Sequence, residues 1–297
     1  MPSDNPPRKI LEVLRLTTDF FRSHEVEGPR VSAELLLAHA LKTERLDLYL
    51  RFDQPLSSHE LDDYRELVRR RLRREPVAYI TGAKGFWNLT LNVTRDVLIP
   101  RPDTECLVEN ALADLSRIRA SLGRSPSVLE LATGSGAVIL SLAADSPAGR
   151  FFASDISPAA LRVAGENARR CLPDERVVFF ASDWFGAVKA AAACFDMIVV
   201  NPPYIPTADI PGLEPEIRDY EPRWALDGGS DGLDHIRHII VEAGRFLTPG
   251  GLLMMEIGWD QQPRIQSLAE ESAWCRDVSF SRDLAGHDRV ARLRKQD

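Results

Sequence analysis

Apolar residues recur at every third or fourth position through the first part of the chain, the spacing of helices that bury one face. The predicted helices span residues 8–23, 31–41, a short stretch after Thr43, and 57–74. Ser57 and Glu60 have the spacing of a capping box at the start of the last helix. Residues 1–82 are therefore predicted to form a small helical bundle.

The pattern changes to alternation of apolar and polar residues at Trp87, which indicates a strand that continues to Val93. Residues 94–96 supply a turn, and residues 97–99 are apolar enough to form a partner strand. We expect a β-hairpin over residues 83–100 that links the bundle to the rest of the chain.

Short apolar runs alternate with helical segments from Ser127 onward, after a helix capped by Asp103 or Thr104. Strands are predicted at residues 128–131, 151–155, 177–181, 195–200 and 252–257, and helices at residues 137–144, 158–170 and 236–247. This alternation is typical of βαβ units, which build a mainly parallel sheet with helices on both faces. Residues 278–280 and 290–293 are predicted to add an antiparallel pair at one edge. The fold class is therefore α/β.

Composition narrows the classes of function. The chain has 297 residues, a formal net charge of −7 and 44% hydrophobic residues, as expected of a globular protein. Its polar first residues resemble neither a secretory signal nor a transit peptide, and no apolar stretch has the length of a membrane helix, so a cytoplasmic protein is predicted. Because an acidic chain is a poor partner for phosphate backbones, no direct contact with nucleic acid is expected. The four cysteines lack the spacing of a metal or redox site.

A cluster of arginines lies near the end of the fourth predicted helix. Its members are Arg69, Arg70, Arg71, Arg73 and Arg74. They form either a surface for an acidic partner or RNA, or a solvated face that complements the negative end of the helix. The usual fate of charge runs favours the solvated face.

Candidate chemistry centres on Asn201-Pro202-Pro203-Tyr204, which directly follows the predicted strand at residues 195–200. The two prolines hold the backbone stiffly at the carboxyl end of that strand, where ligands bind in open α/β sheets. The Asn201 amide oxygen and the Pro202 carbonyl can each accept one N–H of a planar NH2 group, while the Tyr204 ring lies against that group. We interpret this Asn-Pro-Pro-Tyr motif as a device that fixes a poorly nucleophilic nitrogen for reaction.

A glycine loop joins the strand at residues 128–131 to the following helix. It consists of Ala132, Thr133, Gly134, Ser135 and Gly136. Its two glycines permit close approach of a ligand to the backbone. The loop lacks the third glycine of a dinucleotide site and the Gly-Lys-Ser/Thr of a P-loop, so a nucleoside without a diphosphate fits it. A tight turn without a ligand is the alternative for the loop taken alone.

Acidic and aromatic residues stand at the ends of the next two predicted strands. Asp155 is placed to accept hydrogen bonds from both hydroxyls of a ribose. Asp183 or its neighbouring backbone can pair with an adenine edge, and Trp184 supplies an apolar wall. Each residue alone is commonly a capping acid or a core aromatic, but their positions at successive strand ends outline an adenosine site.

Two other features carry alternatives of their own. Arg101 stands between two prolines in a rigid loop, which is either functional or a simple linker. His235 and His238 are three residues apart, but a third ligand at a sensible spacing is missing, so an ordinary helix face is favoured over a metal site.

These motifs together resemble the release-factor glutamine methyltransferases, the HemK/PrmC family of S-adenosylmethionine-dependent enzymes. The resemblance covers nearly the whole chain and rests on residues 75–82, 86–87, 100–105, 132–136, 155, 201–204, 221–222, 231–233 and 283–286. It implies an N-terminal helical bundle (residues 1–82), a β-hairpin linker (83–100) and a Rossmann-like methyltransferase domain with a seven-stranded sheet (101–297).

The resemblance also implies a cofactor, a partner and a set of site residues. The cofactor is S-adenosylmethionine, and the residues expected to hold it are Ala132, Thr133, Gly134, Ser135, Gly136, Asp155, Asp183, Trp184 and Asn201. The residues expected to hold the substrate are Asn201, Pro202, Pro203, Tyr204 and Arg101, of which Asn201, Pro202 and Tyr204 are the expected catalytic residues. The family methylates the side-chain amide nitrogen of the glutamine in the Gly-Gly-Gln motif of peptide-chain release factors. The bundle is expected to help hold that partner, and the enzyme is expected to be a monomer.

Two positions depart from the family pattern. Ala132 stands where glycine is usual, which is acceptable if the residue has a negative φ, and Glu130 replaces a commoner aspartate. Neither change removes a proposed hydrogen-bond partner, so activity is expected, with an altered affinity for the cofactor.

Other functions remain open alternatives. The same chemistry fits methylation of a glutamine in a ribosomal protein. The Asn-Pro-Pro-Tyr motif is shared with DNA adenine-N6 methyltransferases, but the acidic chain and the lack of a separate basic recognition domain argue against nucleic acid. A non-catalytic adaptor for release factors would have no reason to keep the motif and the cofactor residues.

Overall fold

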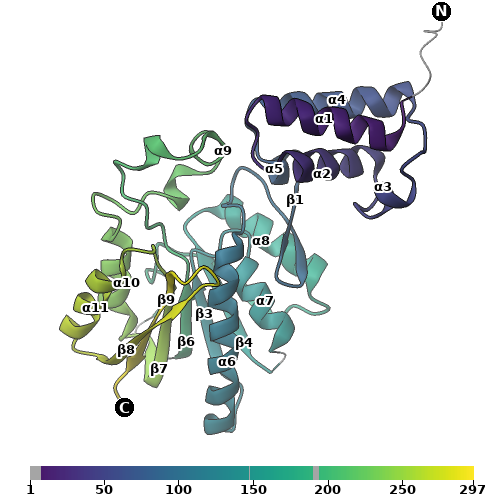
Figure 1. Ribbon diagram of the computed structural model, residues 1–297. Helices are drawn as coiled ribbons and strands as arrows, with labels where there is room; N and C mark the ends of the chain where they lie inside the picture. The colour runs from purple at the N-terminus through teal and green to yellow at the C-terminus, as the bar shows by residue number, and fades with distance from the viewer. Residues whose placement is uncertain (1–7, 147, 190–193) are drawn as a thin grey trace, which may run out of the picture. The chain divides into compact units, whose positions relative to one another are not determined.

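A computed structural model describes residues 8–146, 148–189 and 194–297 of the chain (Figure 1). The chain divides into two compact units. The helical unit comprises Met1–Ala83 with Glu214–Tyr220, and the sheet unit comprises Lys84–Leu213 with Glu221–Asp297. The first seven residues, on which the prediction about a leader partly depends, lie outside the described residues.

The helical unit contains the bundle that the hydrophobic spacing predicts. Its helices are α1 (Ile10–Ser23), α2 (Pro29–Leu41), α3 (Asp47–Leu50), α4 (Ser58–Leu72) and α5 (Val77–Thr81). The capping box at α4 is present, since the Ser57 N–H donates to Glu60 Oε2 at 2.7 Å and the Glu60 N–H donates to Ser57 Oγ at 3.3 Å. Helix α5 has only five residues, too few to leave a periodic signal in the sequence.

The segment Glu214–Tyr220, which includes helix α9 (Pro215–Arg218), belongs to the helical unit although it is far away in the sequence. Arg71 Nη1 donates to Glu216 Oε1 at 2.8 Å, and Arg74 Nε lies 2.9 Å from the same oxygen. Only 4% of Arg71 is exposed, so the prediction of a solvated face is wrong for this residue. The pair is structural, because a buried guanidinium requires a partner.

The remaining members of the arginine cluster differ among themselves. Arg70 forms a fork with the Glu75 carboxylate, with N–O distances of 2.8 and 2.9 Å. Arg69 and Arg73 are exposed, as the solvated interpretation requires. The cluster is therefore divided between buried ion pairs and solvent.

The linker hairpin is present, but with other strands than expected. It pairs β1 (Ala83–Phe86) with β2 (Leu89–Asn92), and Trp87 lies in the turn with a φ of 53°. The prediction of a strand beginning at Trp87 and of a partner at residues 97–99 is wrong, because the positive φ at Trp87 turns the chain. Residues 97–99 are not part of a strand, and the Ile99 N–H donates to Glu221 Oε2 at 3.1 Å.

The sheet unit is built on seven strands, as predicted. They are β3 (Ser127–Leu131), β4 (Arg150–Asp155), β5 (Val177–Ala181), β6 (Phe195–Val200), β7 (Leu247–Glu256), β8 (Cys275–Arg282) and β9 (Asp288–Lys295). The order is β5-β4-β3-β6-β7-β9-β8, and only β9 runs antiparallel to both of its neighbours. The order reverses between β3 and β6, which creates a switch point where ligands bind in such sheets.

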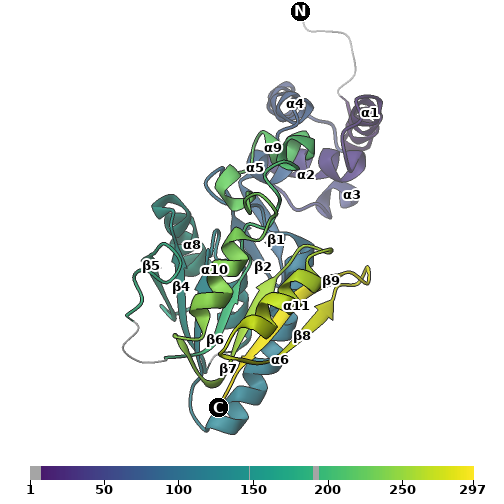
Figure 2. The ribbon, with the colours of Figure 1, turned by 90° about the vertical axis from the view of Figure 1, so that its left-hand side faces the viewer.

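Helices cover both faces of this sheet (Figures 1 and 2). They are α6 (Glu105–Leu122), α7 (Ala137–Asp145), α8 (Pro158–Cys171), α10 (Asp234–Ala243) and α11 (Gln262–Glu271). Val128 of β3 packs in one cluster with α6 and α7, whereas Leu129 and Leu131 pack in another with α10 and α11. This alternation buries β3 on both faces, as parallel sheets require.

Short 3₁₀ turns lie at η1 (Pro102–Thr104), η2 (Ile210–Gly212) and η3 (Arg223–Ala225). Thr104 occupies the N-cap position of α6 without a capping hydrogen bond from its side chain, and Asp103 lies within η1. The prediction of Thr104 as the N-cap residue of α6 is confirmed in position, but its side chain makes no capping hydrogen bond. None of the helices in the described residues combines the length and the apolar character that a bilayer crossing requires.

Candidate active site

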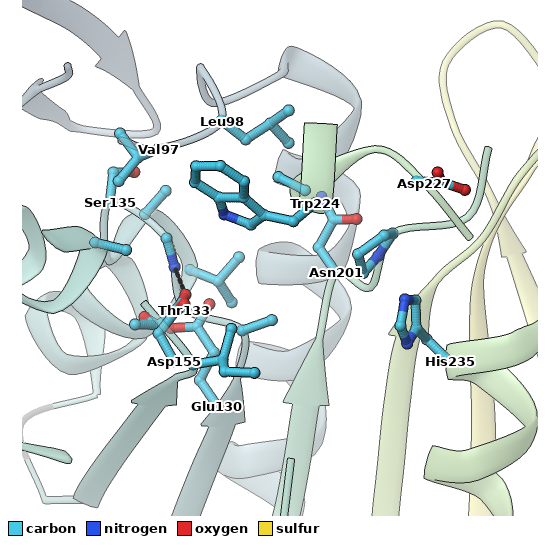
Figure 3. A pocket seen from close by; sticks show the side chains of 18 of the residues that line it. Val97, Leu98, Glu130, Thr133, Ser135, Asp155, Asn201, Trp224, Asp227 and His235 are labelled. Atoms are coloured by element: carbon cyan, nitrogen blue, oxygen red, sulfur yellow. Dashed lines mark hydrogen bonds between the residues drawn. The ribbon is translucent and has the colours of Figure 1, made fainter. Parts of the chain in front are cut away.

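A cavity of about 570 Å³ opens at the carboxyl ends of β3, β4, β5 and β6 (Figure 3). Its walls come from the glycine loop, from the ends of those strands, from residues 96–104 and from the segment around η3. The cavity lies at the switch point of the sheet, and its size is that of a small-molecule site. Topology alone therefore places a ligand here.

Most of the predicted site residues meet in this cavity. Those that line it are Arg101, Ala132, Thr133, Gly134, Ser135, Asp155, Asp183, Trp184, Asn201 and Pro203. Three predicted residues are not among the lining residues: Gly136, Pro202 and Tyr204. Each of the three directly precedes or follows a lining residue in the chain. The Tyr204 side chain is hydrogen-bonded to Glu256, which is not a lining residue.

The glycine loop turns sharply through three residues with positive φ, which are Ala132 at 50°, Gly134 at 55° and Gly136 at 82°. The condition of a negative φ, under which an alanine would be tolerated at position 132, is therefore not met. An L-residue in this region is strained by about 1–2 kcal/mol. The loop keeps its shape because the Gly134 N–H donates to Asp155 Oδ2 at 2.9 Å.

Asp155, at the end of β4, is only 8% exposed. Its Oδ2 accepts the Gly134 N–H and its Oδ1 accepts the Ser157 N–H, both at 2.9 Å. Burial raises the pKa of the Asp155 carboxyl above its usual value. Each carboxylate oxygen can accept a second hydrogen bond, so the residue still fits a ligand with two adjacent hydroxyls.

Trp184 forms a second wall of the cavity. Its backbone has a φ of 46°, and its ring centroid lies 5.2 Å from that of His235. His235 lines the cavity, whereas His238 is exposed on the same helix. The described residues hold no group of three or more His, Cys, Asp or Glu side chains arranged for a metal.

Glu130 is a buried acid at the floor of the cavity, with 3% exposure. Its Oε2 accepts hydrogen bonds from the Thr133 hydroxyl and from the Ile139 N–H, the latter at 3.2 Å. Burial, with a smaller contribution from the neighbouring Asp155 carboxylate, raises the pKa of Glu130 to about 8. Such a carboxyl favours a cationic ligand, whose charge would replace its proton.

Asn201 follows β6 and turns its amide toward the cavity (Figure 3). Its Nδ2 donates to Thr104 Oγ1 at 3.3 Å. The donor end of the amide therefore points to protein, and the acceptor Oδ1 is the end left for a ligand. The Tyr204 hydroxyl donates to Glu256 Oε1 at 3.2 Å, and burial raises the pKa of Tyr204.

The backbone of the Asn-Pro-Pro-Tyr motif is clamped from the side. The Tyr204 carbonyl accepts a hydrogen bond from Gln261 Nε2 at 3.0 Å. A Cβ on Gly232 would lie 2.4 Å from the same carbonyl oxygen, so only glycine fits there. Because both contacts act on the end of the motif, they hold its carbonyls in fixed directions.

Arg101 lines the cavity, but its charge has a partner in the sheet unit. Its guanidinium pairs with the carboxylate of Glu221, and that carboxylate also accepts the Ile99 N–H. The Glu221 carboxylate therefore fixes the Arg101 loop at two points, the Ile99 backbone and the Arg101 side chain. The two prolines of the loop predict the same rigidity.

Known proteins share the sequence over both units. The PrmC N-terminal domain family matches residues 12–82, and a methyltransferase domain family matches residues 123–294. The release factor glutamine methyltransferase of Geobacter sulfurreducens is 42% identical over 95% of this chain and 95% of its own length. That of Rhodopirellula baltica is 37% identical over 99% of this chain and 98% of its own length.

The chain belongs to the release factor glutamine methyltransferase family. This assignment confirms the resemblance, and with it the predictions of an enzyme, of a methyltransferase and of S-adenosylmethionine as the cofactor. The seven-stranded Rossmann-like fold is confirmed as well. The catalytic domain of hMettl16 matches 70% of this chain with a TM-score of 0.52 and 13% sequence identity, a likeness of fold alone.

The cavity fits the cofactor of this methyltransferase family by the chemistry of its walls. Asp155 offers acceptors for hydroxyls, Trp184 offers an aromatic surface, and Glu130 offers an acid that a cation would deprotonate. Gly134 and Ser135 of the glycine loop line the cavity between them. These groups match a nucleoside that carries positive charge and no phosphate.

Several lining residues in this family member escape prediction from sequence. They are Val97, Leu98, Trp224, Asp227 and His235 (Figure 3). All five lie away from the strand ends. Sequence patterns in such segments carry no signal about a cavity. Trp224 is 57% exposed although it lines the cavity, and an aromatic residue within a loop rich in proline and acids was the one available hint.

Proposed function

We propose that this protein transfers a methyl group from S-adenosylmethionine to the side-chain amide nitrogen of the glutamine in the Gly-Gly-Gln motif of a peptide-chain release factor. The orientation of Asn201 carries the proposal. Its donor end is bound to Thr104, which leaves an acceptor beside the cavity for an N–H of the substrate. Membership in a family whose curated relatives carry the name release factor glutamine methyltransferase supports the choice of substrate.

The chain would bind the two reactants with two sets of residues that share Asn201. The residues proposed for the cofactor are Ala132, Thr133, Gly134, Ser135, Gly136, Asp155, Asp183, Trp184 and Asn201. Within this set Asp155 would accept from the ribose hydroxyls, and Trp184 would pack against the base. The residues proposed for the target glutamine are Asn201, Pro202, Pro203 and Tyr204, with Arg101 fixing the loop above them.

The target nitrogen is a weak nucleophile, because its lone pair is delocalised into the amide. Asn201 Oδ1 and the Pro202 carbonyl would each accept one N–H, which orients the nitrogen and stabilises positive charge as it forms a bond to carbon. The bound cofactor supplies the electrophilic methyl group. No strong base is needed, because the alkylated nitrogen is acidic and releases its proton readily.

The helical bundle, residues 1–82, is proposed to contribute to binding of the release factor, with residues 83–100 as the linker and 101–297 as the catalytic domain. We further propose that the enzyme acts in the cytoplasm as a monomer and makes no direct contact with nucleic acid. These points go beyond the family assignment. The described residues contain no helix that could span a membrane.

One assay tests the proposal. The protein is incubated with radiolabelled S-adenosylmethionine and, in separate reactions, with a release factor, with ribosomal proteins and with duplex DNA. We expect label on the release factor alone, and loss of that label when the glutamine of the Gly-Gly-Gln motif is changed to alanine. Label on DNA and not on protein would refute the proposal, and label on a ribosomal protein would transfer the activity to the second substrate class.

A further inference from the structure

Asn201 presents two chemically opposite ends on a side chain that can rotate by half a turn. Its Oδ1 accepts hydrogen bonds and its Nδ2 donates them. An N–H of an incoming amide is attracted by the first end and repelled by the second. The proposed function therefore requires something in the protein that decides which end of Asn201 faces the cavity.

Thr104 is the residue that makes this choice in the structure. Its Oγ1 lies 3.3 Å from Asn201 Nδ2 and accepts a hydrogen bond from it. A hydroxyl also carries one proton of its own, and would act as a donor to Asn201 Oδ1 if that proton had no other acceptor. The Thr104 side chain lies beside the buried Glu256 carboxyl group and favours its ionised form, so that group is the neighbouring acceptor for the hydroxyl proton. This surrounding favours Asn201 Nδ2 as the donor to Thr104 Oγ1, the direction that the structure shows.

Glu256 is the buried acid beside Thr104 and Tyr204. It is 1% exposed at the carboxyl end of β7, and its Oε1 accepts the Tyr204 hydroxyl at 3.2 Å. Within the described residues its Oε2 has no hydrogen-bond partner. One buried carboxyl group therefore binds Tyr204 of the Asn-Pro-Pro-Tyr motif directly and neighbours the threonine that binds Asn201.

Thr104 is itself held in place by the backbone of η1. Its N–H donates to the Arg101 carbonyl at 3.1 Å. The preceding residue, Asp103, pairs with Arg289 at 3.1 Å, and Arg289 also pairs with Asp283 at 3.1 Å. Thr104 is 4% exposed, so water has little access to replace it.

We propose that Thr104 is a positioning residue that fixes the acceptor end of Asn201 toward the target amide. The proposal rests on the proposed function for its consequence in catalysis. Thr104 does not touch the reacting atoms and acts through Asn201. The hydrogen bond to Asn201 also explains why Thr104, a polar residue that follows the rigid Arg101-Pro102 segment, is buried beside the cavity.

Three variants test this assignment. Thr104→Val keeps the shape and removes the hydroxyl, and we expect a fall in kcat of about 10- to 100-fold with KM for both substrates within about twofold. Thr104→Ser restores the hydroxyl and is expected to recover most of the lost kcat. Thr248→Val is the matched control, because Thr248 Oγ1 also donates to a buried acid, Asp196 Oδ1 at 3.0 Å, at the opposite end of the sheet. It should leave kcat unchanged.

A second readout needs no substrate. In the full-length protein with ¹⁵N-labelled asparagine, the side-chain NH2 signal of Asn201 is assigned by its loss in Asn201→Asp. We expect Thr104→Val to shift this signal and to speed its exchange with water, and Thr104→Ser to retain the original signal. This measurement reports the orientation of the amide directly.

The outcomes separate the two claims. If the wild-type protein methylates no release factor, the proposed function is wrong, and the NMR arm still decides whether Thr104 orients Asn201. If the wild-type protein is active and Thr104→Val keeps its kcat and its Asn201 signal, the assignment of Thr104 is overturned. A rise in KM with unchanged kcat would also overturn it, since that result indicates lost binding and not lost orientation.

Discussion

The two ends of the parallel strands treat buried acids in opposite ways. At the amino end, Asp196 of β6 is 2% exposed and accepts a fork from Arg124, with N–O distances of 2.7 and 2.8 Å. The Ser127 N–H and the Thr248 hydroxyl also donate to it, at 2.8 and 3.0 Å. These donors, led by the Arg124 hydrogen bond, outweigh burial and lower the pKa of Asp196.

At the carboxyl end, Glu130, Asp155 and Glu256 are as deeply buried, but their hydrogen bonds come from hydroxyls and backbone N–H groups. Burial prevails and raises the pKa of all three. The four hydrogen bonds to Asp196 fill its acceptor sites, whereas the acids at the carboxyl end accept fewer and can accept more. The difference shows which end of the sheet is prepared for a ligand.

The sharpest way to break this comparison is Asn201→Ala, a change at the carboxyl end. Loss of one aimed dipole should lower kcat about a hundredfold or more. Steady-state kinetics would measure that loss, and calorimetry should find the dissociation constant for S-adenosylmethionine changed far less than kcat. Unchanged turnover would remove Asn201 from the mechanism.

A change at the amino end should act on folding instead. Arg124→Met keeps the aliphatic stem and leaves Asp196 without its cation. We expect a loss of about 1–3 kcal/mol in the free energy of unfolding at pH 7, toward the lower value because half of the Arg124 side chain is in solvent. Urea denaturation measures the loss. A lowered kcat at 25 °C in the folded variant would contradict the division between the two ends.

The two ends should also respond to pH with opposite signs. The folded-state pKa of Glu130 is raised from 4.5 to about 8, so its contribution to stability is present below pH 4.5 and is lost as pH rises toward 8. Asp196 has a lowered pKa, so its contribution is present above its unfolded pKa of 3.8 and is lost as pH falls further. Glu130→Gln should therefore gain stability relative to the wild type between pH 5 and pH 8.

Urea denaturation of both proteins at several pH values, without cofactor, measures that relative gain. Asp196→Asn serves as the control, since its difference from the wild type should be flat over the same interval. A constant difference for Glu130→Gln would show that the buried carboxyl does not titrate in this range.

The smallest effect is expected from Ala132→Gly in the glycine loop. Relief of the strained φ of 50° is partly offset by the entropy of glycine in the unfolded chain, so a net stabilisation of about 1 kcal/mol or less should result. Ala137→Gly, in the first turn of α7, should change stability by a similar amount in the opposite direction. Melting temperatures compare the two, and destabilisation by Ala132→Gly would mean that the alanine is not strained.

Prediction from sequence succeeded where the position of a residue follows directly from a strand end. Asp155, Trp184 and Asn201 each stand just after an apolar run, so the parallel topology alone brings them together. Prediction failed where a residue far away in the sequence determines the contact of a side chain. Arg71 pairs with a carboxylate 145 residues away, and no local pattern distinguishes that arginine from its solvated neighbours.

The hairpin illustrates a different limit. Alternation predicted a strand that begins at Trp87. A tryptophan with a positive φ is rare, so nothing in the sequence marked a turn at this residue. The orientation of Asn201 was equally invisible, because the side chain that sets it lies 97 residues earlier in the chain. Local chemistry was readable, and the partners that orient it were not.

The membership of Glu214–Tyr220 in the helical unit has a consequence for protein synthesis. When the ribosome has finished residue 83, the nascent bundle holds two arginines, Arg71 and Arg74, whose shared carboxylate has not yet been made. Glu216 emerges only after the chain that forms roughly half of the sheet has been made, together with enough further chain to fill the ribosomal tunnel. The first part of the protein to be translated is thus among the last to be completed, and a fragment that ends at residue 83 would lack the partner of a buried cation.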